Sequence, residues 1–449
     1  MIARSKMARH LTAKKMNVKA QTMKEAKMKH RLSIRVLAVV LFMGVSVFCL
    51  PALAAAAEAP DVIKVGIIAP LSGPAAWAGA AIKEGADLLV EEANNAGGIY
   101  IKDLNKKLKL EVIYGDSQSK PAIGATVAEK LITKDKVHFL VGEAFHSSVT
   151  MAIMELAPKY NIPIQSWMPT SNEISDKIKN NPKKYWNFWK GDFASSAYGK
   201  TIHDTYVYLD QKGLFKPKNK TIAFVIEETD FGRSNADSAF ELMQKVGWKK
   251  VAYEVVPIGH NDFYPQLTKI KSLNPDVVVS CFTALNSGTS FLKQYQETGM
   301  TSSHMAIYYP LYPELIKNAK TAADYLIWTP LLLNPAKIEY QAKFQERFKK
   351  RYGKDINNQN GAGYDGMLGV FVAFQEAGSI DPKKVVNAIA KTDYRAVLGR
   401  YQYDLDRHEL KDGLDYIPIP TAQIINGKNI IVWPTKMADA EYQPQPWIR

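Results

Sequence analysis

Apolar residues follow two different periods along the chain from residue 62 onward. Residues 62–68 form a short, nearly continuous apolar run, which is typical of a strand buried on both faces of a sheet. Apolar side chains then recur with helical spacing from Ile82 to Ala93, and they alternate as in a strand from Leu108 to Tyr114. The pattern predicts a strand, a helix and a second strand in succession.

The same succession of strand and helix continues through most of the chain. We expect helix 121–134, strand 137–141, helix 148–160, strand 162–166, strand 221–226, helix 231–247, strand 251–256, helix 264–273, strand 276–282 and helix 287–299. Strands separated by single helices form βαβ units and therefore parallel sheets. The strands are too many for one sheet, and the cycle is interrupted near residues 176–192. The predicted fold class is α/β, with two doubly wound parallel-sheet lobes.

Open parallel sheets bind ligands beyond the carboxyl ends of their strands. The candidate binding loops are therefore those that follow strands 62–68, 137–141, 162–166, 221–226 and 276–282. Helix N-termini at these loops point N–H groups without an intrahelical partner at the cleft, which suits a carboxylate.

The charge of the chain is concentrated at its N-terminus. The 449 residues carry a formal net charge of +14, which raises the question of a nucleic-acid partner. Residues 1–57 hold eleven lysines and arginines and one acid, Glu25, so the remainder is only mildly basic. We therefore expect no nucleic-acid partner. A chain of this length is expected to form more than one domain.

Residues 1–57 have the pattern of an export leader. A basic stretch precedes an apolar run at 36–50, and small residues at 52–57 give an A-x-A cleavage pattern. The run is short for a membrane span, so we expect a cleaved signal peptide and a periplasmic location. Residues 1–27 are expected to be an upstream extension. Cys49 lies in the leader and Cys281 is the only other cysteine, so no intrachain disulfide is predicted.

The sequence offers little support for catalysis or for a cofactor. Residues 361–366 fit G-x-G-x-x-G by letter, but they follow a polar run rather than a strand, so dinucleotide binding is not expected. The eight histidines show no metal-ligand spacing. We find no nucleophile motif. We therefore predict a protein that is not an enzyme and that needs no cofactor or metal.

Five stretches resemble a known family. They are 63–74 (IKVGIIAPLSGP), 85–99, 115–121, 141–148 and 230–232 (DFG). Their order and spacing are similar to the leucine/isoleucine/valine-binding family, the type I periplasmic binding proteins of ABC transporters, from about residue 61 to the end.

The resemblance implies a clamp of two lobes joined by a three-strand hinge that closes around a ligand. Lobe 1 would hold 61–190 and 331–415, and lobe 2 would hold 191–330 and 416–449. The implied partners are a small-molecule ligand and the membrane permease of an ABC transporter, and we expect a monomer.

The family's amino-acid site is matched only in part. The family holds the ligand's carboxylate with a serine in the 141–148 loop and with a threonine-containing loop after the next strand. Here His146 stands about where the serine is expected, with Ser147 beside it. Thr170 matches the second loop, whereas Trp167 and Met168 add bulk to it.

The acid that holds the ligand's ammonium in the family has no counterpart at 307–310, and Glu314 comes about one helical turn too late. A buried ammonium without a counter-charge costs several kcal/mol. We therefore expect an aromatic or apolar carboxylate, or a neutral amide, rather than an ordinary α-amino acid. The candidate ligand-binding residues are Ser72, Trp77, Phe145, His146, Ser147, Trp167, Met168, Thr170, Phe231, Thr283, Tyr308 and Tyr309.

Other interpretations remain open from the sequence. Each candidate residue also has an ordinary structural role: Ser147 and Thr170 are suited to cap helices, and Tyr308 and Tyr309 to fill a strand core. The competing functions are a ligand-sensing protein that presents its ligand to a separate membrane receptor, an ordinary branched-chain amino acid carrier, and an enzyme on a related two-lobed scaffold.

Overall fold

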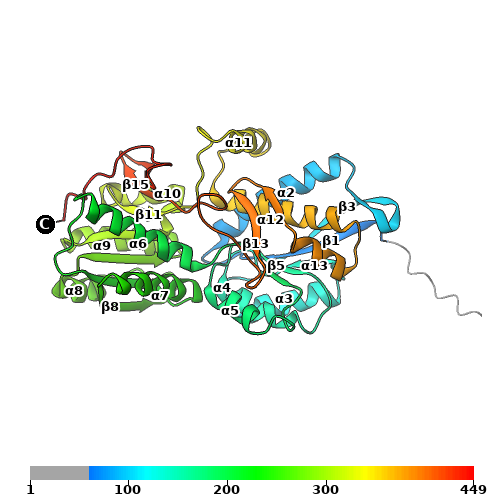
Figure 1. The fold of residues 1–449 in the computed structure, drawn as a ribbon, viewed down its shortest axis with the longest axis horizontal. Helices are drawn as coiled ribbons and strands as arrows, with labels where there is room; N and C mark the ends of the chain where they lie inside the picture. Colours follow the sequence, from blue (N-terminus) through cyan, green and yellow to red (C-terminus); the bar gives the residue numbers. More distant parts are fainter. Residues whose placement is uncertain (1–59, 449) are drawn as a thin grey trace, which may run out of the picture. The chain divides into compact units, whose positions relative to one another are not determined.

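Two β-sheets organise the chain in this computed structural model, which describes residues 60–448 (Figure 1). The first sheet has the spatial order β12 (Asp393–Arg395), β13 (Arg400–Asp404), β14 (Glu409–Leu410), β6 (Phe188–Lys190), β5 (Ile164–Ser166), β4 (Phe139–Val141), β1 (Val62–Ala69), β3 (Lys106–Asp116), β2 (Ile99–Ile101). The second sheet has the order β16 (Lys428–Trp433), β15 (Thr421–Ile425), β11 (Ile327–Thr329), β10 (Ser303–Tyr308), β9 (Val277–Phe282), β7 (Thr221–Glu227), β8 (Lys249–Val256). The expected leader and Cys49 lie outside the described residues.

Helices connect the strands of both sheets, as the βαβ pattern predicts. The helices associated with the first sheet are α2 (Ala76–Asn95), α3 (Pro121–Thr133), α4 (Ser147–Ile153), α5 (Asn172–Asn180), α11 (Glu339–Tyr352), α12 (Asn358–Ala377) and α13 (Pro382–Ile389). Those associated with the second sheet are α6 (Ser195–Gln211), α7 (Asp230–Lys245), α8 (Tyr264–Leu273), α9 (Leu285–Glu297) and α10 (Pro313–Ala319). The predicted α/β fold class is confirmed.

The chain passes between the two sheets three times. We call residues 191–194 after β6 the first crossover, residues 330–338 after β11 the second, and residues 411–420 after β14 the third. Each sheet is therefore assembled from separate parts of the sequence, which is the expected three-strand hinge. The bounds of the two lobes stay a prediction.

The central strands are buried and parallel. In the second sheet every residue of β9 is buried, and β7 pairs in parallel with both β8 and β9. In the first sheet β1 pairs in parallel with β3 and β4. The edges add antiparallel strands that the periodicity did not predict, among them the β15–β16 hairpin.

Two predicted segments differ from the observed elements. The helix expected over 148–160 ends at Ile153 and continues as a short 3₁₀ turn, Met154–Leu156. Pro158 follows and offers no N–H to continue the helical hydrogen bonds, although Ala157 before it keeps helical dihedral angles. The segment near 176–192, where the cycle breaks, holds the end of α5 and the short strand β6 before the first crossover.

The glycine pattern at 361–366 lies within α12 and lets this helix pack closely on α2 (Figure 1). A Cβ on Gly363 would lie 2.0 Å from the carbonyl oxygen of Ile82, and a Cβ on Gly85 would lie 1.9 Å from that of Asn360. These glycines therefore serve helix packing. Over residues 60–448, no helix combines the length and the hydrophobicity that crossing a membrane requires.

Candidate functional site

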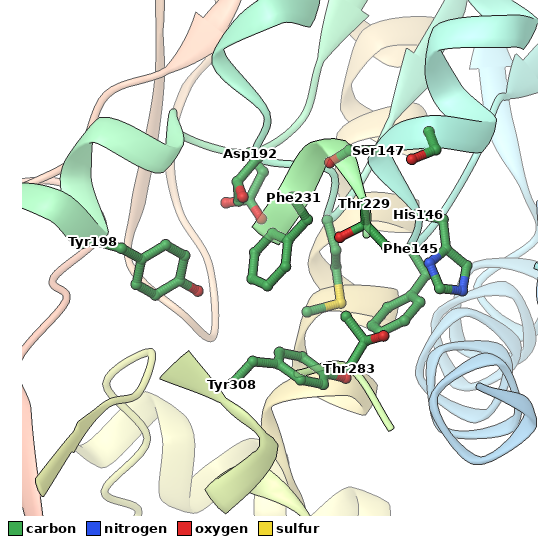
Figure 2. A pocket seen from close by; sticks show the side chains of 12 residues that line it. Phe145, His146, Ser147, Asp192, Tyr198, Thr229, Phe231, Thr283 and Tyr308 are labelled. Atoms are coloured by element: carbon green, nitrogen blue, oxygen red, sulfur yellow. The ribbon is translucent and has the colours of Figure 1, made fainter. Parts of the chain in front are cut away.

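A cavity lies where the carboxyl ends of strands from both sheets meet (Figure 2). Its lining residues are Phe145, His146, Ser147, Ser148, Met168, Thr170, Asp192, Tyr198, Thr229, Phe231, Thr283 and Tyr308. The position agrees with the rule that parallel sheets bind ligands beyond their carboxyl ends.

Loops that follow strands supply most of the lining. The loop after β4 leads into α4 and carries Phe145, His146 and Ser147, and the loop after β5 carries Thr170. From the second sheet, the turn after β7 provides Thr229, whose side chain accepts a hydrogen bond from the N–H of Gly232 and caps α7. The starts of helices therefore surround the cavity.

Aromatic rings form much of the cavity wall (Figure 2). The ring of Tyr308, at the end of β10, lies 5.6 Å from that of Phe145 and 6.1 Å from that of Phe231, measured between ring centroids. Tyr198 meets Phe231 edge to face at 6.3 Å. Such walls suit a flat or apolar ligand, with hydroxyl groups of serine and threonine as polar anchors.

Direct contacts join the two sheets around the cavity. The side chain of Gln359 in α12 donates a hydrogen bond to the Tyr308 hydroxyl at 2.9 Å. The backbone N–H of Asn172 donates to Ser234 in α7 at 3.0 Å, and its side-chain amide donates to Ser238. Phe145 and Tyr308 are each only 7% exposed although both line the cavity. The clamp is therefore closed.

His146 and Asp192 line the cavity together with two tyrosines, and none of these side chains carries a positive charge at neutral pH. Burial lowers the pKa of His146 to about 4, so its imidazole is uncharged, and its Nε2 lies 2.9 Å from the Ser119 hydroxyl. Burial raises the pKa of Asp192 well above its ordinary value, although the N–H of Phe193 and the charge of Lys190 act in the opposite direction. The lining residues include no lysine or arginine.

A buried glutamate fixes a lining loop behind each side of the cavity. Glu143 accepts hydrogen bonds from the hydroxyl of Ser117 and from the N–H of His146, both at 2.6 Å, and burial raises its pKa to about 8. Glu227 at the end of β7 accepts from the N–H of Thr283 at 2.7 Å, and burial raises its pKa as well. These carboxyl groups thus take up the backbone N–H groups of two lining residues, His146 and Thr283.

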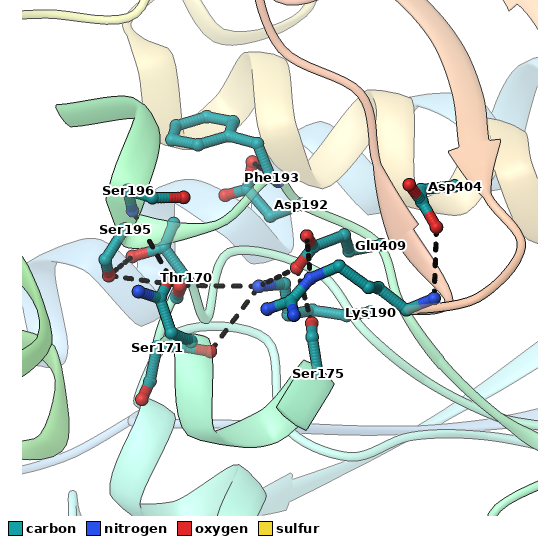
Figure 3. A network of polar contacts seen from close by, with 12 residues as sticks. Thr170, Ser171, Ser175, Lys190, Asp192, Phe193, Ser195, Ser196, Asp404 and Glu409 are labelled. Atoms are coloured by element: carbon teal, nitrogen blue, oxygen red, sulfur yellow. Dashed lines mark hydrogen bonds and ion pairs between the residues drawn. The ribbon is translucent and has the colours of Figure 1, made fainter. Parts of the chain in front are cut away.

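A polar network supports the loop that carries Thr170 (Figure 3). Lys190, fully buried at the end of β6, pairs with Glu409 of β14 at 2.9 Å and donates to the carbonyls of Thr170 and Ser171 at 3.3 and 3.4 Å. Arg407 pairs with the other oxygen of Glu409 at 2.7 Å. The network thus ties the strands before the first and third crossovers to the cavity wall.

Eight of the twelve residues expected from the sequence line the cavity. They are Phe145, His146, Ser147, Met168, Thr170, Phe231, Thr283 and Tyr308. The other four, Ser72, Trp77, Trp167 and Tyr309, do not.

Ser72 and Trp77 lie outside the cavity for different reasons. The Ser72 side chain is exposed and donates a hydrogen bond to Asp116. Trp77, in α2, packs against Tyr312 near the second sheet, with ring centroids 4.8 Å apart. Trp77 therefore joins the two sides of the clamp.

Trp167 and Tyr309 belong to the core. The Trp167 ring packs against Gly366 in α12, where a Cβ would lie 2.4 Å from it. Tyr309 is fully buried, its ring lies over Gly288, and its hydroxyl lies 2.8 Å from that of Ser280. Its neighbour Tyr308 has a positive φ of 76°, so the chain turns at the strand end and only Tyr308 reaches the cavity.

Sequence reasoning missed four lining residues: Ser148, Asp192, Tyr198 and Thr229. Ser148 and Thr229 adjoin expected residues. Asp192 comes from the first crossover and Tyr198 from α6, and neither follows a strand that was predicted. Within residues 60–448, no group of three or more histidine, cysteine or acidic side chains is placed to hold a metal ion.

Comparisons with known proteins agree on one type of fold. Residues 62–416 match the family described as "Periplasmic binding protein". The "Leu/Ile/Val-binding protein homolog 1" of Brucella melitensis is 27% identical over 372 residues, which cover 81% of this chain and 91% of that protein.

Two solved structures share the fold. A putative branched-chain amino acid ABC transporter from Silicibacter pomeroyi has a TM-score of 0.74 and 20% identity, covering 86% of this chain and 100% of that one. An ABC transporter solute-binding protein from R. palustris, in complex with benzoate, has a TM-score of 0.71 and 18% identity, covering 86% and 99%.

Proposed function

The chain belongs to the periplasmic binding protein family and is a solute-binding protein rather than an enzyme, and from this premise we propose that it captures an aromatic or apolar carboxylate, or a neutral amide. It would deliver this ligand to the membrane permease of an ABC transporter. The observation that carries the proposal is the closed cavity with aromatic walls at the carboxyl ends of both sheets.

The composition of the lining favours this class of ligand. Four aromatic rings, Phe145, Tyr198, Phe231 and Tyr308, offer flat apolar surface. The hydroxyl groups of the lining serines and threonines, together with the helix starts, are suited to a carboxylate or an amide oxygen. On the second sheet, the place where the family's acid is expected is taken by Tyr308, which brings a ring instead of a charge.

Relatives supply arguments on both sides. The solute-binding protein from R. palustris was solved with benzoate, so this fold accepts an aromatic carboxylate. The relative from Brucella melitensis is called a Leu/Ile/Val-binding protein homolog, which favours branched-chain amino acids as the second candidate. We favour the aromatic or amide ligand because the walls of this cavity are aromatic and the family's acid is absent from its expected place.

The rest of the proposal follows from the family. We propose that the leader directs export to the periplasm and is removed there, and that the mature chain acts as a monomer. The lobes 61–190 with 331–415 and 191–330 with 416–449 would close about the three crossovers. Delivery of the ligand to a separate membrane receptor is the alternative use of the same clamp.

A thermal-shift screen followed by calorimetric titration tests the ligand class. The screen compares benzoates, phenylacetates, benzamides, leucine and valine, and a ligand present at 100 times its Kd is expected to add about 2.7 kcal/mol to the free energy of unfolding. Binding of aromatic acids or amides is expected. Tight binding of leucine or valine, without binding of the aromatic compounds, would refute the proposed ligand class.

An uptake assay tests whether the protein delivers its ligand to a membrane permease. Cells that lack the gene are expected to take up the identified ligand more slowly than cells that carry it. Normal uptake together with loss of a response to the ligand would favour a sensing role instead.

A further inference from the structure

Asp192 places a carboxyl group in the cavity wall. It lies in the first crossover, is 7% exposed, and points toward the cavity beside Phe231 and Tyr198 (Figure 2). Its Oδ1 accepts a hydrogen bond from the N–H of the next residue, Phe193, at 2.9 Å. Its Oδ2 has no hydrogen-bond partner among residues 60–448.

The charged side chains near Asp192 do not donate a hydrogen bond to its Oδ2. Lys190, two residues earlier, directs its Nζ to Glu409 and to two carbonyl oxygens, and it makes no hydrogen bond to Asp192 (Figure 3). Glu409 acts on Asp192 with a like charge. On other elements, Tyr198, Tyr401 and Tyr403 lie close enough for Asp192 to raise the pKa of their hydroxyl groups, so all three are neutral. The hydroxyls of Tyr401 and Tyr403 are engaged with Asp365 and Gln165. An acceptor is therefore left for the ligand.

A ligand without a hydrogen-bond donor makes this arrangement costly. A buried polar group that stays unpaired loses its hydration without compensation. An N–H or O–H group on the ligand removes this penalty by donating to Oδ2.

We propose that Asp192 is a specificity-determining residue of the cavity and accepts a hydrogen bond from an N–H or O–H group of the ligand. This inference rests on the proposed function. The hydrogen bond to Asp192 selects hydroxy- or amino-substituted aromatic acids and primary amides over acids that carry no donor. Asp192 thereby supplies, from the hinge, the acidic contact that the sequence around 307–310 does not offer.

Calorimetric titration of a small panel tests the inference. The ligands are benzoate, which carries no donor, 4-hydroxybenzoate and 4-aminobenzoate, which add one, benzamide, and leucine. The proteins are the mature chain, its Asp192→Asn variant, and Asp415→Asn as the matched control. Asp415 is an exposed aspartate of the third crossover and does not line the cavity.

The wild-type protein is expected to bind at least one donor-bearing ligand about tenfold more tightly than benzoate, as one added hydrogen bond to a buried acceptor implies. Asp192→Asn is expected to bring this ratio to within about threefold of unity, and Asp415→Asn to leave it unchanged. If circular dichroism shows that Asp192→Asn does not fold, the ratio of wild-type affinities for donor-bearing ligands and benzoate still tests the role of Asp192.

The other outcomes separate the two proposals. Equal wild-type affinities for benzoate and its substituted forms would overturn the role of Asp192 and leave the proposed ligand class standing. Tight leucine binding that Asp192→Asn abolishes would support Asp192 as the partner of a donor and overturn the ligand class. Binding of none of the five compounds would overturn both.

Discussion

Replacing Lys190 with methionine tests whether the buried network supports the cavity. Lys190 is fully buried, and the Glu409 side chain is 10% exposed, so removing the lysine leaves a largely desolvated carboxylate. Breaking a buried ion pair from one side typically costs about 3–5 kcal/mol of unfolding free energy. Glu409 keeps Arg407 at 2.7 Å and Ser175, which places the expected cost at the lower end, near about 3 kcal/mol.

The loss of hydrogen bonds adds to this cost and connects it to binding. The Ser171 carbonyl loses the donor that Lys190 provides, at about 1 kcal/mol, whereas the Thr170 carbonyl keeps the N–H of Ser195 at 2.7 Å. We therefore expect Lys190→Met to lower the free energy of unfolding by about 3–4 kcal/mol. Because Thr170 lines the cavity, ligand affinity is expected to fall too.

Urea denaturation measures the effect, and two further variants interpret it. Lys200→Met removes a lysine whose side chain is 64% exposed and paired with Asp204, so a change of at most about 1 kcal/mol is expected. The double variant Lys190→Met with Glu409→Gln is expected to lose less than the sum of the two single losses. A loss for Lys190→Met no larger than that for Lys200→Met would refute the reasoning.

Three further changes probe closure, packing and pH. Trp77→Ala removes the ring contact with Tyr312 and is expected to weaken ligand binding about three- to tenfold by calorimetry; an unchanged Kd would show that the contact does not favour closure. Gly363→Ala forces a Cβ against the carbonyl of Ile82, so it is expected to lower the free energy of unfolding by at least about 2 kcal/mol, measured by urea denaturation. An unaltered urea midpoint would contradict the close packing of α12 on α2. Burial raises the pKa of Glu143 from 4.5 to about 8, so the stability that this group contributes is complete below pH 4.5 and is lost as the pH rises to 8. Glu143→Gln should flatten this decline in the free energy of unfolding. Identical pH profiles for the variant and the wild type would contradict this role of Glu143.

The elements with a strong period were predictable from the sequence. Strand β1 and helix α8 lie within a residue of their expected bounds, because a buried strand and an amphipathic helix leave distinct apolar patterns. The edge strands β12–β14 were not predicted. They are two to five residues long and mostly polar, so no apolar pattern marks them.

The site was predictable where a loop follows a strand. Phe145, Thr170 and Thr283 line the cavity for this reason. Asp192 was missed because the alternation of strand and helix breaks over 176–192, so the short strand β6 that leads to it was not recognised. Local sequence also does not tell which way a side chain turns. Trp167 points to α12 because Gly366 leaves room there, and that glycine is nearly 200 residues away.

Native mass spectrometry tests the central claim most directly. The mature protein is equilibrated with a small-molecule extract, its complexes are weighed, and the protein is then denatured to release and identify the bound ligand. The account predicts a one-to-one complex whose released ligand is an aromatic or apolar carboxylic acid, or an amide, that carries an N–H or O–H donor for Asp192. Release of leucine, isoleucine or valine as the bound ligand would contradict it.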